Sequence, residues 1–167
     1  MNKKNKNRGF SLIEVIVVIA LMAIVTGATM SIYSWIRTQR IEKLTENLSD
    51  SISDLRTANR TKDGTYNLYL IKTSKGFKTT IYLNGGDEYK SSNLGNVGSI
   101  ELVDASGNKY SISSSEGLWM QFDKSTGKLQ KMHVSSGPDV ESEIYINYSG
   151  LSRKIDISEL TGKHYIE

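Results

Sequence analysis

Cysteine is absent from this 167-residue chain, proline occurs once and histidine twice. Without cysteine there can be no disulfide framework, no thiol nucleophile and no thiolate ligand for zinc. A lone His133 on a strand is typical of a surface residue rather than of a catalytic base, and the other histidine is His164. The sequence also lacks the G-x-S-x-G, P-loop and H-E-x-x-H motifs. We therefore predict that the protein is not an enzyme and uses no cofactor.

Metal sites have little support either. Asp87, Glu88 and Asp104 lie in predicted loops, where calcium ligands are often found. The chain nevertheless contains no D-x-[DN]-x-[DN]-G pattern, which would space the ligands for calcium. Turn and solubility roles are favoured for these acids, and no metal is predicted.

An excess of cations is confined to the N-terminus. The chain has 21 Lys and Arg against 18 Asp and Glu, and four of the cations, Lys3, Lys4, Lys6 and Arg8, precede residue 10. The remaining chain holds 17 cations against 18 acids. The formal charge of +3 therefore does not indicate a nucleic-acid-binding domain.

A long apolar run follows these cations, at residues 10–36. As a helix of about 27 residues it would extend roughly 40 Å, which exceeds the ~30 Å hydrocarbon core of a bilayer. The cations before it predict a single span with the N-terminus in the cytoplasm and the C-terminal bulk outside. Glu14 is the anomaly, because an acid within a span is costly and usually has a partner.

The residues Gly9-Phe10-Ser11-Leu12-Ile13-Glu14-Val15 after a short Lys-rich leader resemble the class III signal of type IV pilins and type II secretion pseudopilins. The resemblance implies that a prepilin peptidase removes residues 1–9 by cutting between Gly9 and Phe10, and that the new amino group of Phe10 is methylated. It further implies that residues 10–36 form a membrane and assembly helix. Glu14 would then meet the Phe10 amine of a neighbouring subunit, an arrangement that recovers part of the desolvation cost of the acid.

Two other interpretations of the N-terminus remain. A conventional secretory signal would place its cleavage site near residues 26–28, although Glu14 would interrupt its apolar region. A plain single-pass anchor would explain the length and orientation of the run, but neither Gly9 nor Glu14.

Residues 37–63 are predicted to continue the helix in amphipathic form. Apolar residues recur there at spacings of three and four, which places them on one stripe that packs on the rest of the protein. The predicted helix–sheet core residues of this stripe are Leu44, Leu48, Ile52 and Leu55. Asp63-Gly64 is a helix stop signal.

Residues 64–167 are predicted to form an antiparallel β domain, so the fold class is α+β, with a long N-terminal helix packed on sheet. Three connections have hairpin chemistry, at residues 104–108, 123–128 and 158–163. The pattern predicts an antiparallel meander of about eight strands, with two packed sheets favoured over one. The strands are expected at residues 66–73, 77–83, 100–103, 110–113, 118–122, 129–134, 144–148 and 154–157.

The stretch between residues 84 and 98 has no apolar period and contains four glycines, so we expect an exposed loop that carries a subunit-specific contact. The C-terminal domain also resembles H-type minor pseudopilins and T-type minor pilins. The resemblance rests on residues 144–163, whose pattern is degenerate.

Two functions follow from these resemblances. The first is a structural subunit, a minor pilin or pseudopilin, of a type IV pilus-like or type II secretion-like filament. Its partners would be the prepilin peptidase, other pilins and, before assembly, the cytoplasmic membrane; afterwards it would lie in a surface or extracytoplasmic filament.

The alternative is a DNA-capturing minor pilin of a competence pilus. Residues 150–154 partly resemble the basic Gly-Arg-x-Arg turn of T-type minor pilins, with Leu151 in place of the first arginine. The candidate DNA contacts are Arg153, Lys154 and Lys163, with His164 beside them. The alternative in which Arg153 and Lys154 are only a solvated strand start is favoured.

Overall fold

The computed structural model describes residues 10–167, apart from the side chains of residues 28–31. The predicted leader, residues 1–9, lies outside the described residues. The chain divides into two compact units, residues 1–36 and residues 37–167. Each unit is described below by itself.

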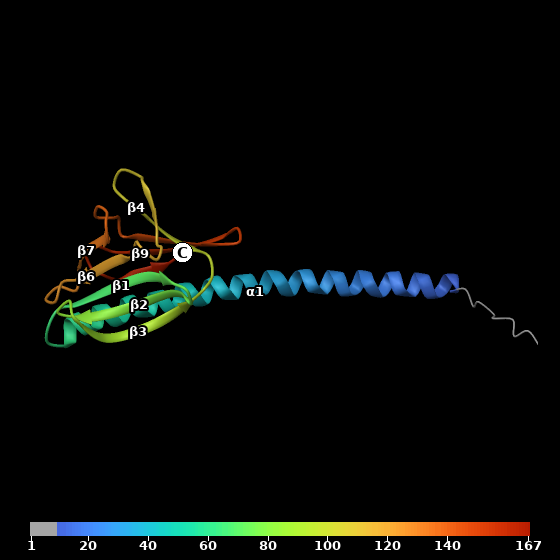
Figure 1. The fold of residues 1–167 in the computed structure, drawn as a ribbon, viewed down its shortest axis with the longest axis horizontal. Helices are drawn as coiled ribbons and strands as arrows, with labels where there is room; N and C mark the ends of the chain where they lie inside the picture. Colours follow the sequence, from blue (N-terminus) through green and yellow to red (C-terminus); the bar gives the residue numbers. More distant parts are fainter. Residues whose placement is uncertain (1–9) are drawn as a thin grey trace, which may run out of the picture. The chain divides into compact units, whose positions relative to one another are not determined.

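One helix and ten strands make up the described chain (Figure 1). The α+β prediction of a long N-terminal helix with antiparallel sheet is confirmed. The elements are α1 (Leu12–Thr61), β1 (Tyr66–Thr73), β2 (Gly76–Leu83), β3 (Asp87–Gly95), β4 (Ser99–Val103), β5 (Lys109–Ser111), β6 (Leu118–Phe122), β7 (Leu129–Val134), β8 (Glu143–Tyr148), β9 (Leu151–Ile157) and β10 (His164–Ile166).

The strands form two five-stranded antiparallel sheets, in the orders β3-β2-β1-β6-β7 and β10-β9-β8-β4-β5. The expected preference for two sheets is confirmed, but the simple meander is wrong. The chain leaves the first sheet after β3, builds β4 and β5 of the second sheet, returns for β6 and β7, and then completes the second sheet. Strand β6 therefore pairs with β1, with Met120 opposite Leu68, which lies 52 residues earlier in the chain. Local patterning does not encode the hydrogen bonds between such distant segments.

The expected loop at residues 84–98 is also wrong, because β3 occupies most of it. This strand lies at the edge of its sheet and pairs with β2, with two register shifts along the way. Its side chains are exposed except near Leu94, which is buried. Backbone hydrogen bonds to β2 hold the strand, so it needs no apolar alternation and gives no sequence signal for one.

The core lies between the two sheets and the C-terminal half of α1. Leu44 is 1% exposed, and Leu48, Ile52 and Leu55 are fully buried. Both sheets contribute buried side chains to the same cluster, such as Leu68 from β1 and Ile155 from β9. Burying each such side chain stabilises the fold by roughly 1.5 to 3 kcal/mol.

Polar contacts lock the end of α1 to the first strand. Asn59 is 1% exposed, and its side-chain amide donates to the carbonyl of Tyr66 at 2.8 Å while its Oδ1 accepts from the Tyr66 N–H at 2.9 Å. The helix ends at Thr61, and Gly64 follows with φ at 98°, a conformation that glycine adopts without strain. The predicted stop at Asp63-Gly64 thus lies where the chain turns into β1.

Candidate functional site

The first candidate site is the start of α1, in the first unit. Ser11 precedes the helix, and its Oγ accepts from the Glu14 N–H at 3.3 Å. In return, the Glu14 Oε2 accepts from the Ser11 N–H at 2.9 Å. This reciprocal pair is a capping box, which satisfies two backbone donors that the first turn of a helix leaves unpaired.

The capping box gives Glu14 a local role that the sequence analysis missed. The signal was present, because Ser11-Leu12-Ile13-Glu14 is an S-x-x-E pattern immediately before an apolar run. The helix N-terminus also favours the negative charge. One carboxylate oxygen accepts this bond, and an ionised carboxylate has about four lone-pair sites. The acid therefore retains capacity for a second donor, such as an amine.

A hollow of about 310 Å³ flanks Glu14 on the surface of the helix. Besides Glu14, its lining consists of apolar residues spaced by three and four, namely Phe10, Ile13, Val17 and Val18. These side chains are exposed, from 48% for Val18 up to 88% for Phe10. The acid thus lies in an apolar groove that no described residue of the first unit covers.

In the apolar part of α1, the described side chains of residues 12–27 and 32–35 are all exposed. An 18-residue window has a mean hydropathy of 2.5, and none of it is buried. Trp35 and Tyr33 are exposed at its end, where the aromatic belt of a spanning helix is expected. The length and composition of the helix fit a membrane-anchored precursor.

The second candidate site comprises the cations proposed to contact DNA, and the structure separates them. Arg153 directs its Nη2 to the Glu42 Oε1 on α1, at 3.4 Å. Lys163 is exposed in the turn between β9 and β10. His164 turns toward the helix, where its Nε2 lies 2.7 Å from the Ser49 Oγ. Burial lowers the pKa of His164, and the nearby charge of Arg56 lowers it further.

Lys154 is surrounded by carboxylates. Its Nζ lies 3.0 Å from the Glu167 Oε2, 3.2 Å from the Glu143 Oε1 and 3.8 Å from the Asp156 Oδ2. Hydrogen bonds to Glu167 and Glu143 raise the pKa of Lys154 above its ordinary value. One cation facing three acids leaves this part of the second sheet with negative charge, which repels phosphates rather than attracting them.

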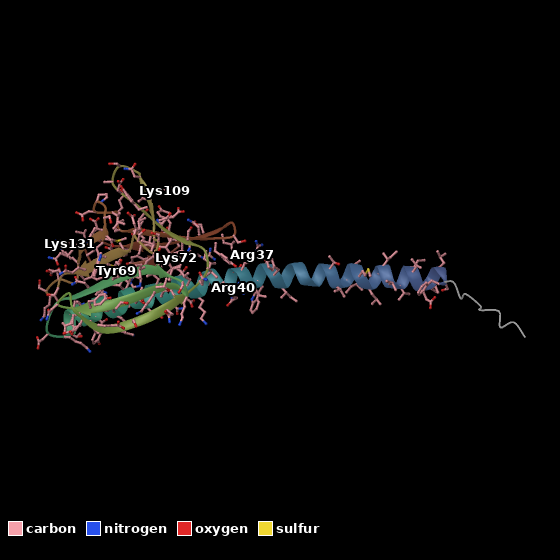
Figure 2. The ribbon with its side chains drawn as sticks, viewed as in Figure 1. Arg37, Arg40, Tyr69, Lys72, Lys109 and Lys131 are labelled. Atoms are coloured by element: carbon pink, nitrogen blue, oxygen red, sulfur yellow. The ribbon has the colours of Figure 1, made fainter. Side chains whose placement is uncertain are left out.

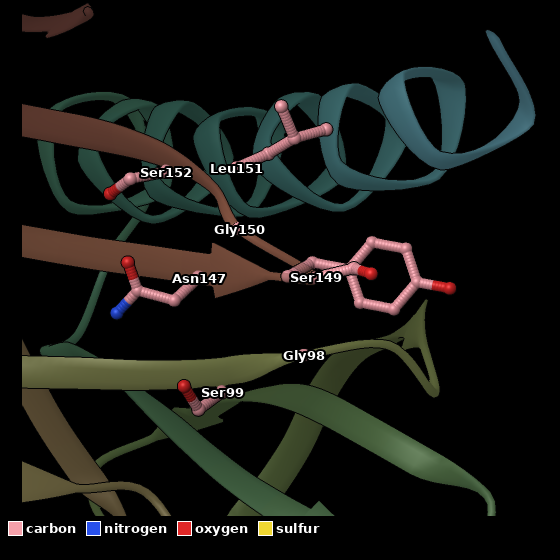
Figure 3. A pocket seen from close by; sticks show the side chains of 8 residues that line it. Gly98, Ser99, Asn147, Ser149, Gly150, Leu151 and Ser152 are labelled. Atoms are coloured by element: carbon pink, nitrogen blue, oxygen red, sulfur yellow. The ribbon is translucent and has the colours of Figure 1, made fainter. Parts of the chain in front are cut away.

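The turn that resembles a basic pilin turn lies between β8 and β9, at Ser149 and Gly150. Figure 3 shows the hollow of about 420 Å³ beside it. The hollow is lined by residues 98–99 and 147–152, of which none carries a charge. Arg37 approaches the same turn from the helix and donates to the Ser149 Oγ at 3.2 Å. This contact ties the turn to α1.

The acids considered for calcium are placed in different ways. Asp104 accepts from the N–H groups of Ser106 and Asn108 and from the Tyr110 hydroxyl, and the Asn108 amide lowers its pKa most. Asp87 and Glu88 lie on β3. Within residues 10–167, no group of three His, Asp or Glu side chains is placed to hold a metal ion.

Comparison with known proteins supports the first site. Residues 4–30 match the family model for the prokaryotic N-terminal methylation motif. No curated protein and no solved structure matches the chain. The motif is the class III prepilin signal, and it implies processing by a prepilin peptidase and assembly with other pilins. Together with the long helix on two antiparallel sheets, it is consistent with a type IV pilin-like protein.

Proposed function

We propose that the protein is a structural subunit, a minor pilin or pseudopilin, of a type IV pilus-like or type II secretion-like filament. The observation that carries the proposal is the exposed apolar half of α1 with a prepilin signal at its start. A bilayer covers such a surface before assembly, and the helices of other subunits cover it afterwards. The β domain of residues 64–167 is then the part that faces outward.

The hollow beside Glu14 supports a specific contact between subunits. Removal of residues 1–9 creates an α-amine on Phe10, which is mostly cationic at neutral pH. A second copy that brings this amine to Glu14 pairs two charges inside an apolar environment, where either charge alone would be costly. The apolar lining of the hollow accommodates the neighbouring helix. The parallel helices would then be displaced by about four residues, which places Ile13 of one copy beside Val17 of the next.

The absence of cysteine makes this contact directly testable. We expect the double variant Ile13→Cys/Val17→Cys, treated with a bifunctional thiol reagent in cells, to form a ladder of covalent multimers. Each single-cysteine variant should stop at the dimer or below. The protein remaining monomeric under the same treatment, with processing intact, would contradict a filament.

Substitutions of Glu14 separate the charge from the cap. Glu14→Ala in the double-cysteine background should abolish the ladder and leave membrane insertion unchanged, because removing a charge lowers the cost of insertion. Glu14→Gln keeps a capping acceptor at this position and removes the charge. It should also abolish the ladder, whereas the matched surface variant Glu46→Gln should not. A full ladder with Glu14→Gln would assign Glu14 to capping alone.

A further inference from the structure

The second sheet carries a hollow of about 300 Å³ on the face that points away from the core. Pockets for drug-sized ligands measure ~300 to 1,000 Å³, so this one suits a small molecule. Along β4 and β8 its lining side chains alternate with buried ones, which places them together on the outer face of the sheet. Four strands line the hollow, with Glu101 and Val103 from β4, Lys109 from β5, Tyr145 and Asn147 from β8, and Ser152 from β9.

Glu101 and Lys109 bring opposite charges into this hollow. Strands β4 and β5 pair antiparallel, with Val103 opposite Lys109 and Glu101 opposite Ser111. Glu101 and Lys109 are therefore diagonal neighbours on one face, a relation in which residues are typically ~7 to 8 Å apart. Glu101 is half-buried, and Lys109 is exposed at the hairpin of β4 and β5 (Figure 2).

Neither of these charges is paired within the described part of the chain. The ion pairs found among residues 10–167 include neither Glu101 nor Lys109. Opposite charges on neighbouring strands often pair with each other. Here both line the hollow without doing so, and each keeps its hydrogen-bonding capacity for a ligand group of opposite charge.

The charges around the hollow are ordered across the sheet. The strand order is β10-β9-β8-β4-β5, so Lys109 lies on the edge strand and Glu101 on the strand beside it. On the other side of Glu101, three carboxylates gather around the single cation of Lys154, which leaves net negative charge on β8 to β10. A ligand that carries both charges is therefore oriented, with its cation toward Glu101 and its anion toward Lys109.

Uncharged polar groups line the rest of the hollow. Asn147 and Ser152 lie directly opposite each other on β8 and β9 (Figure 3). An amide offers donors and an acceptor, and a hydroxyl offers both as well. The Tyr145 hydroxyl donates to the Glu143 Oε2 at 2.5 Å, a bond that holds the tyrosine in place in the lining. This part of the hollow suits an uncharged polar group of a ligand.

We propose that the hollow binds a free α-amino acid, whose ammonium contacts Glu101 and whose carboxylate contacts Lys109. Both charges of an amino acid are carried by groups on one carbon, and ionic N–H···O contacts are ~2.7 to 2.9 Å long. One amino acid therefore bridges two charged side chains that are diagonal neighbours. An uncharged polar side chain of the ligand then extends over β8 to Asn147 and Ser152.

The probe for this site is L-glutamine, because its side-chain amide matches the uncharged part of the hollow. The test uses the full chain in nonionic detergent and measures saturation transfer from the protein to ligand protons by NMR, with detergent alone as the blank. We expect a dissociation constant of about 1 mM or lower. No transfer to L-glutamine at concentrations well above this value would overturn the proposal.

Two analogues of the probe each lack one charge. N-acetyl-L-glutamine has no ammonium, and the α-amide of L-glutamine has no carboxylate. Each should bind about tenfold more weakly than L-glutamine, because hydrogen bonds between charged groups are stronger than neutral ones. Equal or tighter binding of either analogue would overturn the proposed contact of the missing group.

Two substitutions assign the charges to their residues. Glu101→Gln should weaken binding of L-glutamine about tenfold and leave the affinity for N-acetyl-L-glutamine unchanged. Lys109→Met should weaken binding of L-glutamine equally and leave the affinity for the α-amide unchanged. The matched controls, Glu88→Gln and Lys131→Met, remove an exposed acid and an exposed cation from the first sheet and should leave every affinity unchanged.

Each remaining outcome decides the question. An equal loss in the control variants, or an unchanged affinity for L-glutamine in both site variants, would overturn the proposal. Urea unfolding of each variant shows whether it is folded. The analogues test the unsubstituted chain, so their comparison stands even if a variant unfolds. The crosslinking ladder through Ile13 and Val17 uses none of these residues, so the filament proposal stands or fails separately.

Discussion

The two halves of α1 form one continuous helix, but the first half exposes its apolar side chains whereas the second half buries them. In the first unit, Ile19 is 61% exposed and Leu21 is 57% exposed. In the second unit, Leu48 and Ile52 are fully buried against the sheets. The first half is apolar on all sides, as a membrane helix is, whereas the second is apolar on one stripe. Both halves are helical, so helical propensity does not distinguish them. They differ in the surroundings that their apolar surfaces require.

The second half also carries charges that reach the strands. Asp54 on α1 pairs with Lys90 on β3, and Glu42 pairs with Arg153 on β9. Such partly exposed pairs contribute little stability, with a median of about 0 to 1 kcal/mol. They connect the helix to the edge strand β3 of one sheet and to the inner strand β9 of the other, and so fix its rotation, while the buried stripe supplies the stability.

The largest effect is expected from a substitution of Gly9, which directly precedes the apolar half of the helix. Replacing Gly9 by valine should block processing completely, because the prepilin peptidase is expected to bind an extended backbone with no side chain there. Mass spectrometry should then find the full-length precursor in the membrane. Gly27→Ala is the matched control, since a Cβ there would meet nothing within 4 Å, and it should be processed to a chain that starts at Phe10. Normal processing of Gly9→Val would contradict the prepilin assignment.

Separating the halves physically should divide their properties. A fragment of residues 37–167 should be soluble without detergent, since it keeps the buried stripe and both sheets and loses the exposed apolar half. The full chain should require detergent. Analytical ultracentrifugation of both, with circular dichroism of the fragment, measures the difference. A fragment that aggregates or lacks β structure would show that the apolar half contributes to folding of the domain.

The same substitution should have different costs in the two halves. Leu48→Ala removes a fully buried side chain and should lower the free energy of unfolding by about 2 to 5 kcal/mol. Leu21→Ala, in the full chain in detergent, should leave the unfolding of the β domain unchanged. Urea unfolding followed by tryptophan fluorescence measures both. A cost below half a kcal/mol at Leu48 would mean that the stripe does not support the domain.

Most strand positions were predictable because their alternation is local. Strands β6 and β7 match the predicted residues 118–122 and 129–134. The sheet order was not predictable, because the pairing of β1 with β6 depends on contacts between distant segments. Strand β3 was missed for a different reason, since an edge strand held by backbone hydrogen bonds carries no apolar period. The short β10 was missed in the same way, as it pairs with β9 by three residues at the edge of the other sheet.

The candidate sites also differ in whether a local sequence pattern or contacts between distant segments define them. Gly9, Phe10 and Glu14 were recognised from a contiguous motif, and the match at residues 4–30 covers them. The contact between the turns at residues 123–128 and 158–163 was not visible in the sequence, because Gly127 and Gly162 become neighbours only in the folded domain. The charges counted along the chain near Arg153 could not reveal the acids that pair with Arg153 and Lys154 in the folded domain.

The smallest effect concerns acids, which the two halves use differently. Asp123 accepts hydrogen bonds from Ser125 and Thr126, and these bonds lower its pKa from 3.8 to about 2. The bond from the Thr126 side chain contributes most to this shift. Because the folded pKa lies below the unfolded one, its contribution to stability is present above pH 4 and is lost as the pH falls from about 4 to 2. Asp123→Asn should therefore lower the urea midpoint of the β domain slightly at pH 6, and the difference from the parent should vanish near pH 2. Glu14→Gln, the corresponding change in the apolar half, should leave that midpoint unchanged at either pH. A difference at Asp123 that persists undiminished at pH 2 would assign the effect to the shape of the turn rather than to its charge.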